Sequence, residues 1–353
     1  MDRPLKILYA LQGTGNGHMA RAREIVPLLQ TLGNHEIHVW VSGTQSELSL
    51  PFPIQRKLHG FTLYYGKKGS VHLGRTLLKN RLFKFLWDVW QSPVTSYDFI
   101  LNDFEPVSAW AGRIRGIPVF ALSHQAAVVH PDAPRPKSKK PWLEKGMYWF
   151  APFQAANGFH FKPIEPYVFP PVIRKEIRNL PQTPSGSLLV YLPAYTPEKL
   201  LPILTSLDVP VNAYFRGTFS AYTVEHVTVL PIDSTQFLQS FQCADSVLCG
   251  AGFELPTEAL FHGKRVAVVP IKNQYEQACN AAAAVECGAW HFSKLKKKNV
   301  KALRKWLKSP APKALHCPDQ TEEILTDILR HFAAQGDFKR WKNEQLVLDL
   351  TLR

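Results

Sequence analysis

Short apolar runs alternate with amphipathic segments along most of the chain, and glycine or polar residues separate them. In the first half this pattern predicts strands over 6–11, 36–41, 99–101 and 118–122, with helices over 19–32 and 107–114. In the second half it predicts strands over 188–192, 211–215, 228–231, 246–249 and 265–269, with helices over 197–207, 235–243 and 254–261. Strands that alternate with helices form parallel sheets covered by helices, so we expect an α/β protein.

Prolines at 163, 166, 170 and 171 interrupt the pattern between these halves. A chain of 353 residues, 45% of them hydrophobic, can bury two cores. We therefore predict a first domain over 1–162, a linker over 163–172 and a second domain over 173–330. The tail over 331–353 is expected to be helical and to pack back on the first domain.

A glycine-rich loop follows the first strand and consists of Gly13, Thr14, Gly15, Asn16 and Gly17. Glycines in this position let a phosphate or an acceptor approach the backbone amides at the start of a helix. A dinucleotide fold would need a third glycine where the chain has His18, and an acid after the second strand. The loop is therefore interpreted as an acceptor or phosphate loop rather than an NAD site.

His18 lies at the mouth of this loop and is the candidate catalytic base, because its unperturbed pKa near 6.5 suits proton transfer from a hydroxyl. Asp103, at the end of a strand, is expected to reach the same sheet edge and orient the imidazole. Glu105 and His124 fall at that edge too and are candidates for the acceptor side. The alternatives are structural: His18 or Asp103 could cap a helix, and His124 could satisfy loop backbone.

The second half contains a matching glycine turn, GAGFELPTE over 250–258, followed by the amide-rich segment NQYEQACN over 273–280. Free amides at a helix start suit a diphosphate, an acid suits ribose hydroxyls, and side-chain amides suit a sugar. Thr196 precedes a helix and is predicted to cap it near the phosphate. The candidate donor-binding residues are Tyr195, Thr196, Ile232, Gly250, Gly252, Phe253, Glu254, Thr257, Glu258, Asn273, Gln274, Glu276, Gln277 and Asn280.

Both glycine segments resemble those of GT-B glycosyltransferases, in particular family 28-like proteins distantly similar to the UDP-N-acetylglucosamine transferase of lipid II synthesis. NDFEP at 102–106 and LSHQ at 122–125 are similar to uncharacterised bacterial and archaeal proteins of this type. The resemblance implies two Rossmann-like α/β domains that face each other across a cleft, with the acceptor in the first and a nucleotide sugar in the second.

The same resemblance implies a role for each matching residue. Ile232 would face the base, the Gly252 and Phe253 amides the diphosphate, and Glu258 the ribose, while Glu276 and Gln277 would hold sugar hydroxyls, Asn280 the loop, and His18 a proton or phosphate. The chain has NQYEQ at 273–277 rather than a double glutamine, and lacks the serine and glycine-rich turn at 192–196. These departures leave the donor sugar open.

The expected reaction is an inverting hexosyl transfer from a UDP-linked sugar, because no carboxylate is clearly placed as a covalent nucleophile. No DxD motif ends a strand, so neither a metal nor a cofactor is expected. Two alternatives remain. A UDP-sugar 2-epimerase of the same fold would use Glu276, Glu105 and Asp103, and a non-catalytic protein would bind a sugar nucleotide or polyanion without turnover.

The net charge of +14, from 42 Lys and Arg against 28 Asp and Glu, favours polyanionic surfaces. Segment 67–90 predicts a basic amphipathic helix, 134–145 a basic loop beside the acceptor site, and 294–308 a basic helix. The absence of a recognisable binding module argues against nucleic acid. Five scattered cysteines and the lack of a leader or apolar span predict a cytoplasmic protein, peripheral on the inner membrane face and acting on a lipid-linked or envelope glycan. The sequence leaves the oligomeric state undetermined.

Overall fold

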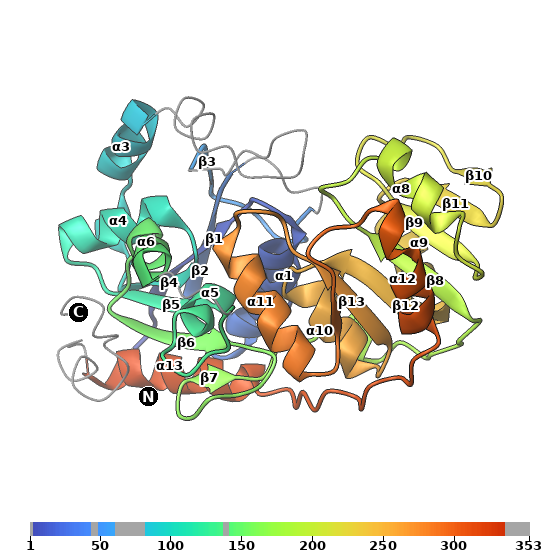
Figure 1. Ribbon diagram of the computed structural model, residues 1–353. Helices are drawn as coiled ribbons and strands as arrows, with labels where there is room; N and C mark the ends of the chain where they lie inside the picture. Colours follow the sequence, from blue (N-terminus) through green and yellow to red (C-terminus); the bar gives the residue numbers. More distant parts are fainter. Residues whose placement is uncertain (1–2, 44–48, 61–81, 137–140, 336–353) are drawn as a thin grey trace.

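A computed structural model describes residues 3–43, 49–60, 82–136 and 141–335 of the chain. It contains two seven-stranded sheets with helices packed on their faces (Figure 1). The strands of the first sheet lie in the order β3-β2-β1-β4-β5-β6-β7, and all of these pairs are parallel. Their bounds are β1 Lys6–Gln12, β2 Glu36–Ser42, β3 Arg56–Leu58, β4 Phe99–Asp103, β5 Val119–Ser123, β6 Ala155–Phe159 and β7 Val168–Phe169.

The second sheet has the order β10-β11-β9-β8-β12-β13-β14 and is parallel except for the β10–β11 pair. Its strands are β8 Ser187–Tyr191, β9 Val211–Tyr214, β10 Tyr222–Val224, β11 Val227–Leu230, β12 Ala244–Gly250, β13 Arg265–Val269 and β14 Trp290–His291. Strands β4, β5 and β13 are mainly apolar and are buried along almost their whole length, because helices cover both faces of the sheets.

The helices of the first half are α1 Asn16–Thr31, α3 Leu82–Gln91, η1 Val94–Ser96, α4 Pro106–Arg115, α5 His124–Val128 and α6 Pro141–Phe150. Those of the second half are α7 Lys175–Arg178, α8 Pro197–Leu204, α9 Ser234–Cys243, α10 Glu254–Phe261, α11 Tyr275–Glu286, η2 Lys297–Asn299, α12 Val300–Leu307 and α13 Thr321–Gln335. Figure 1 shows α1, α10 and α11 between the two sheets.

The segment between the two halves is part of the folded structure, although its prolines indicated a separate linker. Segment 163–172, predicted as a linker, contributes β7 to the first sheet, where it pairs with β6. Beyond it, Ile173 and Ile177 are buried in a core cluster that includes residues of both halves. The halves are therefore packed together rather than joined by a free hinge.

Helix α13 returns to the first sheet, starting at Thr321 rather than within the predicted tail over 331–353 (Figure 1). The ring of Phe332 stacks on Phe99, with centroids 3.8 Å apart. Residues 336–353 lie outside the described part of the chain.

Two of the three basic segments are helical in the described residues, as predicted, and the predicted loop differs. Residues 61–81 lie outside the described chain, and α3 accounts for the remainder of the predicted helix over 67–90. The predicted loop over 134–145 includes the start of α6, with 137–140 outside the described residues. In α12, Leu303 and Trp306 are fully buried, so the apolar face of that helix packs within the protein. In the described part of the chain, no helix combines the length and hydrophobicity needed to cross a bilayer.

Candidate active site

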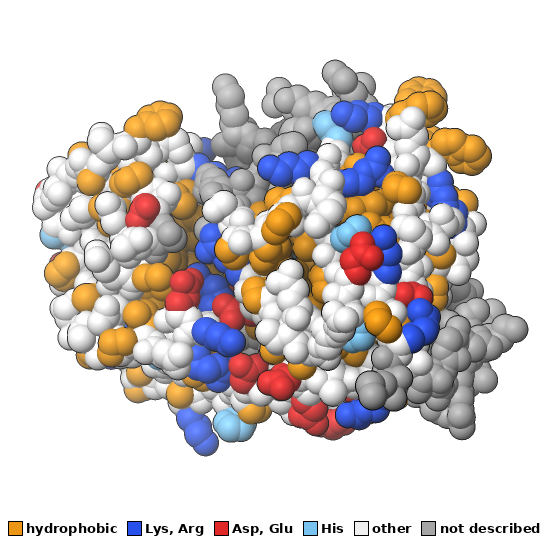
Figure 2. Space-filling model, turned by 180° about the vertical axis from the view of Figure 1, so that it is seen from behind, with side chains coloured by type: hydrophobic (Ala, Val, Ile, Leu, Met, Phe, Trp, Pro, Cys, Tyr) orange, Lys and Arg blue, Asp and Glu red, His pale blue; other side chains and the backbone are white. Residues whose placement is uncertain are grey.

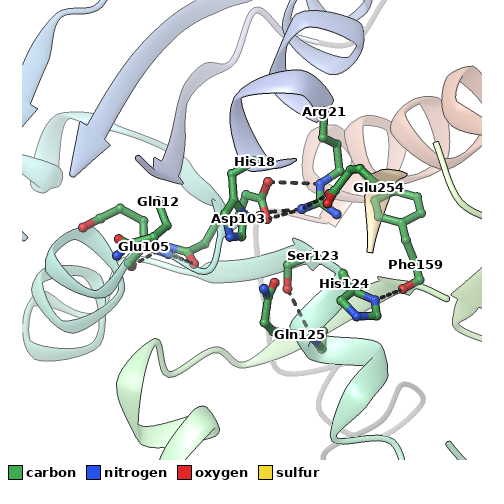
Figure 3. Close-up of polar contacts among 12 residues, drawn as sticks. Gln12, His18, Arg21, Asp103, Glu105, Ser123, His124, Gln125, Phe159 and Glu254 are labelled. Atoms are coloured by element: carbon green, nitrogen blue, oxygen red, sulfur yellow. Dashed lines mark hydrogen bonds and ion pairs between the residues drawn. The ribbon is translucent and has the colours of Figure 1, made fainter. Parts of the chain in front are cut away.

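The carboxyl end of the first sheet brings His18, Arg21 and Asp103 together (Figure 3). Strand β1 pairs with β4 so that Leu11 lies opposite Asp103, which places the loop after β1 beside the end of β4. His18 Nδ1 donates to Asp103 Oδ1 at 2.9 Å. Arg21, one helical turn after His18, donates from Nε to Oδ2 at 3.1 Å and from Nη2 to Oδ1 at 3.2 Å. The carboxylate is thus held by two cationic or polar partners on one face of α1.

Burial and neighbouring charges shift the pKa values of His18 and Asp103 in opposite directions. Burial alone would lower the pKa of His18, but the charge and hydrogen bond of Asp103 outweigh it and raise the pKa above its ordinary value. Burial alone would raise the pKa of Asp103, yet Arg21 and His18 together lower it. Asp103 is therefore ionised in a fully buried position, and its charge favours an imidazolium at His18.

The bond from Nδ1 to Asp103 fixes the neutral tautomer of His18 and leaves Nε2 without a proton. The side chain is 12% exposed, and among the described residues Nε2 makes no hydrogen bond. The alternative in which His18 caps a helix is wrong, because Gly15 occupies the N-cap position of α1 and no side chain caps it. His18 is thus placed to accept a proton from a molecule in the cleft.

Glu105 is a helix cap rather than part of this cluster. Its two carboxylate oxygens accept from the backbone amides of Val107 at 2.7 Å and Ser108 at 2.6 Å, at the start of α4. The capping alternative considered for Asp103 therefore belongs to Glu105. Because Glu105 is fully buried and engaged with α4, its expected contact with an acceptor or sugar finds no support.

In the glycine loop, residues 13–17, neighbouring atoms and the backbone conformation leave little room for larger side chains. The Gly13 amide donates to Ser42 O at 2.6 Å, and Gly15 has a φ of 100°, which favours glycine. Thr14 Oγ1 accepts from Gln12, and Asn16 begins α1. A Cβ on Gly17 would lie 2.2 Å from Oε2 of Glu254. Gly17 thus makes room for a carboxylate from the second domain.

Three pairs of polar side chains join the two domains beside this loop. Arg21 Nη2 lies 3.3 Å from Glu254 Oε1, at the start of α10. Gln125 Nε2 donates to Glu276 Oε1 at 3.1 Å.

The third pair joins His124 Nε2 and the side-chain amide of Asn280 at 2.7 Å. The atom of Asn280 in this contact is Oδ1, and His124 Nδ1 lies 2.8 Å from Phe159 O, so a neutral imidazole donates to one of these two oxygens. The ring also stacks on Phe253, with centroids 3.8 Å apart. Burial lowers the pKa of His124 to about 4, so it is a neutral residue of the domain interface. It does not line an open acceptor site, as had been considered.

The acid predicted for the ribose is held by an arginine that lies two residues beyond the predicted linker over 163–172. Arg174 donates to Glu258 through Nε at 2.6 Å and through Nη2 at 2.8 Å, and Glu258 is 2% exposed. The Glu258 carboxylate is therefore buried and paired rather than solvated. Thr257 is turned to its own helix, because its hydroxyl donates to Phe253 O and Glu254 O. Contact with a donor through the Thr257 hydroxyl is therefore not supported.

The other donor candidates surround the same end of the second sheet. Gln277 Oε1 accepts from the Ile271 amide, and Asn280 donates to Ala251 O, so both support the loops. Asn273 has a φ of 65° and Gln274 is the N-cap residue of α11 without a side-chain cap. The remaining positions are Gly250 at the end of β12, Gly252 with open space beside its Cα, and Ile232 against the core.

Thr196 occupies the predicted N-cap position of α8, but its side chain caps no backbone amide. It hydrogen-bonds Glu198 instead, and this bond lowers the pKa of Glu198. The hydroxyl of neighbouring Tyr195 accepts from the Leu295 amide at 3.0 Å. Both residues are thus engaged within the second domain.

A pocket lies next to His18 in the first domain, between the ends of β4 and β5 and helices α5 and α6. Phe104 lines it and stacks on His18, with centroids 6.5 Å apart and planes at 9°. Phe104 has a φ of 58°, which is rare for a bulky residue and is found preferentially at functional sites. The other lining residues are Asn102, Ala121, Ser123, Gln125, Ala126, Val129, Met147, Tyr148, Ala151 and Phe153.

Sequence reasoning assigned no role to Arg21, Phe104 or Arg174. It placed Gln125 with His124 at the carboxyl edge of the sheet, as a residue of the acceptor side or a partner of loop backbone. Arg21 follows His18 by three residues in a helix, so its place on the same face was readable. Arg174 and Gln125 meet partners distant in sequence, and no local pattern shows such contacts. Within the described residues, no group of three or more His, Cys, Asp or Glu side chains is placed to hold a metal ion.

Comparisons with known proteins add the family and the fold. The family model described as glycosyl transferase family 1 matches residues 5–308. MurG of Acinetobacter baumannii has a TM-score of 0.57 at 18% identity, with 93% of this chain and 100% of MurG covered.

Two plant enzymes give similar values. A UDP-glucosyltransferase from Polygonum tinctorium capable of glucosylating indoxyl has a TM-score of 0.57 at 14% identity, with 95% of this chain and 100% of that chain covered. UGT2 of Phytolacca americana, complexed with UDP-2fluoro-glucose and pterostilbene, has a TM-score of 0.54 at 13% identity and 94% coverage of both chains. No curated protein matches the chain significantly. The GT-B fold expected from the sequence is confirmed.

Proposed function

The chain belongs to glycosyl transferase family 1, and we propose that it transfers a hexose from a UDP-linked donor to an acceptor hydroxyl, with inversion and without a metal. The observation that carries this proposal is the 2.9 Å bond between His18 and Asp103 beside the start of α10. It supplies an oriented base at the place where two domains meet.

In the proposed reaction, His18 Nε2 accepts the proton of the acceptor hydroxyl while its oxygen attacks the anomeric carbon. Asp103 holds the imidazole in the required tautomer and stabilises the imidazolium that forms. The bond from the sugar to the diphosphate breaks as the new bond forms, so one displacement inverts the anomeric centre. Proton transfer of this kind contributes about 10² to 10⁴ in rate.

The donor's diphosphate is placed at the start of α10, where the Gly252 and Phe253 amides precede the helix. No side chain caps this helix, so its first amides are available to an anion. This placement supports departure of the nucleoside diphosphate without a divalent ion. The structural neighbours named with UDP or UDP-sugars support UDP as the nucleotide of the donor.

The acceptor is proposed to approach His18 from the side of Phe104, whose ring stacks on the imidazole. The pocket behind Phe104 has room for little more than a water molecule, so only its rim could contact an acceptor. An apolar ring beside the proposed base supports an acceptor with an apolar part next to the reacting hydroxyl.

A lipid-linked or envelope glycan acceptor is supported by an exposed apolar surface on α3 and α6, seen over α3 in Figure 2. Phe83 is 89% exposed, Trp90 72% and Trp142 67%. Together with the net charge of +14, this surface supports peripheral attachment to the anionic inner face of the cell membrane.

The first experiment separates transfer from the alternatives. The protein is incubated with UDP-, GDP- and dTDP-sugars, with and without lipid-linked and glycan acceptors, and products are analysed by NMR. Transfer with inverted anomeric configuration supports the proposal, and retention contradicts the mechanism. Conversion of the donor without acceptor indicates the epimerase, while binding without turnover indicates a non-catalytic protein.

Membrane attachment is tested by flotation with vesicles that contain anionic phospholipid. We expect salt-sensitive binding that is lost in a Phe83→Ser, Trp90→Ser variant and retained in a Phe219→Ser variant, whose exposed ring lies in the second domain. Equal flotation of both variants would contradict the assignment of this surface.

A further inference from the structure

Glu254 carries a carboxylate to the place where the donor's phosphates are expected. Its Oε1 lies 3.3 Å from Arg21 Nη2, and its Oε2 occupies the position beside Gly17 where any side chain would clash. Figure 3 shows the Glu254 side chain directed from α10 towards Arg21 and Asp103. An anionic group of the second domain therefore lies against the glycine loop of the first.

Several features attract an anion to this position. Helix α1 begins after Gly15 with no side-chain cap and no acid in its first turn, so its free amides carry a partial positive charge. Arg21 adds a full positive charge, and it is only 4% exposed. Its Nη1 is buried and makes no hydrogen bond within the described chain, so the guanidinium retains an unused donor. Burying such a donor is unfavourable unless a ligand can satisfy it.

A carboxylate and a phosphate group cannot share this position without strong like-charge repulsion. Arg21 already faces two acids, Asp103 and Glu254, so its single charge is fully compensated. The Glu254 side chain is 23% exposed, whereas that of Asp103 is fully buried. Glu254 is therefore the acid that can turn out into solvent.

We propose that the Glu254 carboxylate competes with the diphosphate group of a nucleoside diphosphate for Arg21, and that donor binding displaces the carboxylate. This inference rests on the proposed nucleotide-sugar donor. Arg21 then joins the departing phosphate to the Asp103 carboxylate that orients His18. Glu254 thus weakens nucleotide binding, and Arg21 strengthens it.

The test compares wild type with Glu254→Gln, which keeps the size of the side chain and removes its charge. Dissociation constants of uridine, UMP and UDP are measured by calorimetry. We expect Glu254→Gln to bind UDP about tenfold more tightly, UMP with a smaller gain and uridine without change, because the repulsion acts on phosphates. The matched control is Glu286→Gln, in which the acid pairs with Lys162 at the surface and is 53% exposed. It should leave all three constants unchanged.

A second variant, Arg21→Lys, keeps the charge but loses the forked donor geometry. We expect it to weaken UDP binding, and the gain from Glu254→Gln should shrink when both substitutions are combined. If UDP binds and Glu254→Gln leaves its affinity unchanged or weaker, the competition is refuted while the proposed function stands. If neither wild type nor Glu254→Gln binds UDP, GDP or dTDP, the proposed function fails and the competition fails with it.

Discussion

The two halves of the chain each contain a strand, a glycine turn and a helix, and the polar residues near the two turns behave differently. After β1, His18 and Arg21 of α1 both contact Asp103 at the end of β4. After β12, the side chains of Thr257 and Glu258 are engaged by their own helix and by Arg174. The first turn thus presents side-chain chemistry, and the second presents mainly backbone amides. Similar sequence motifs therefore do not predict similar use of side chains.

The largest expected effect comes from His18→Ala, which removes the proposed base from the first turn. Transfer should fall about 10³-fold, because general base catalysis contributes that much, while UDP affinity changes less than about twofold. Initial rates of UDP release and calorimetric affinities provide the two measurements. His291→Ala, at an exposed position of β14, is the matched control and should keep the wild-type rate. A variant that turns over normally would remove His18 from the mechanism.

Asp103→Asn should lower the rate about 10²-fold and shift its pH dependence. In wild type, activity should fall as pH drops through the pKa of His18, which Asp103 raises above the ordinary value. Removing that charge lowers the pKa, so the acidic limb of kcat/KM should move to lower pH. A limb that stays in place would show that Asp103 does not act through His18. Circular dichroism checks that the buried substitution leaves the fold intact.

Much of the fold is predictable from the sequence, because long apolar runs and helical periodicity fix the central elements. The strand over 265–269, for example, coincides with β13. The edge strands β7 and β14 are only two residues long, and such short segments carry no period that a pattern could reveal. Helix α6 was missed because prolines and lysines before it are typical of a loop.

The candidate site, too, contains some contacts that the sequence predicts and others that it does not. The proximity of His18 and Asp103 follows from topology, since the carboxyl ends of adjacent parallel strands meet at one edge. The Arg174–Glu258 pair joins residues 84 positions apart, and only the packing of the chain just beyond the linker against α10 brings them together. Whether a side chain faces a ligand or its own backbone, as for Thr257, depends on its rotamer and cannot be obtained from motif spacing.

Glu258→Gln tests the second turn, with an intermediate effect expected. If Glu258 accepts hydrogen bonds from ribose hydroxyls, the variant should bind UDP about tenfold more weakly, the range for bonds to a charged group. It should bind 2′,3′-dideoxy-UDP as wild type does, since that analogue lacks both hydroxyls. Equal losses for both nucleotides would mean that Glu258 only anchors Arg174 and that the second turn acts through its amides alone.

The smallest effect is expected for Glu105→Gln, which tests whether Glu105 belongs to the reacting side chains near the first turn. The glutamine has one acceptor oxygen where Glu105 uses two, so one amide at the start of α4 loses its partner. The free energy of unfolding should fall by about 1 kcal/mol, as for other capping residues, and be seen as a lower midpoint in urea. Asp233→Asn, at the cap of α9, is the matched control and should show a similar or smaller loss. The rate of transfer should stay within about twofold of wild type, because a cap acts on the helix and not on the substrate. A large loss of rate with unchanged stability would instead mean that Glu105 takes part in the reaction with Asp103. The first turn would then contribute one more side chain to the chemistry than its hydrogen bonds indicate.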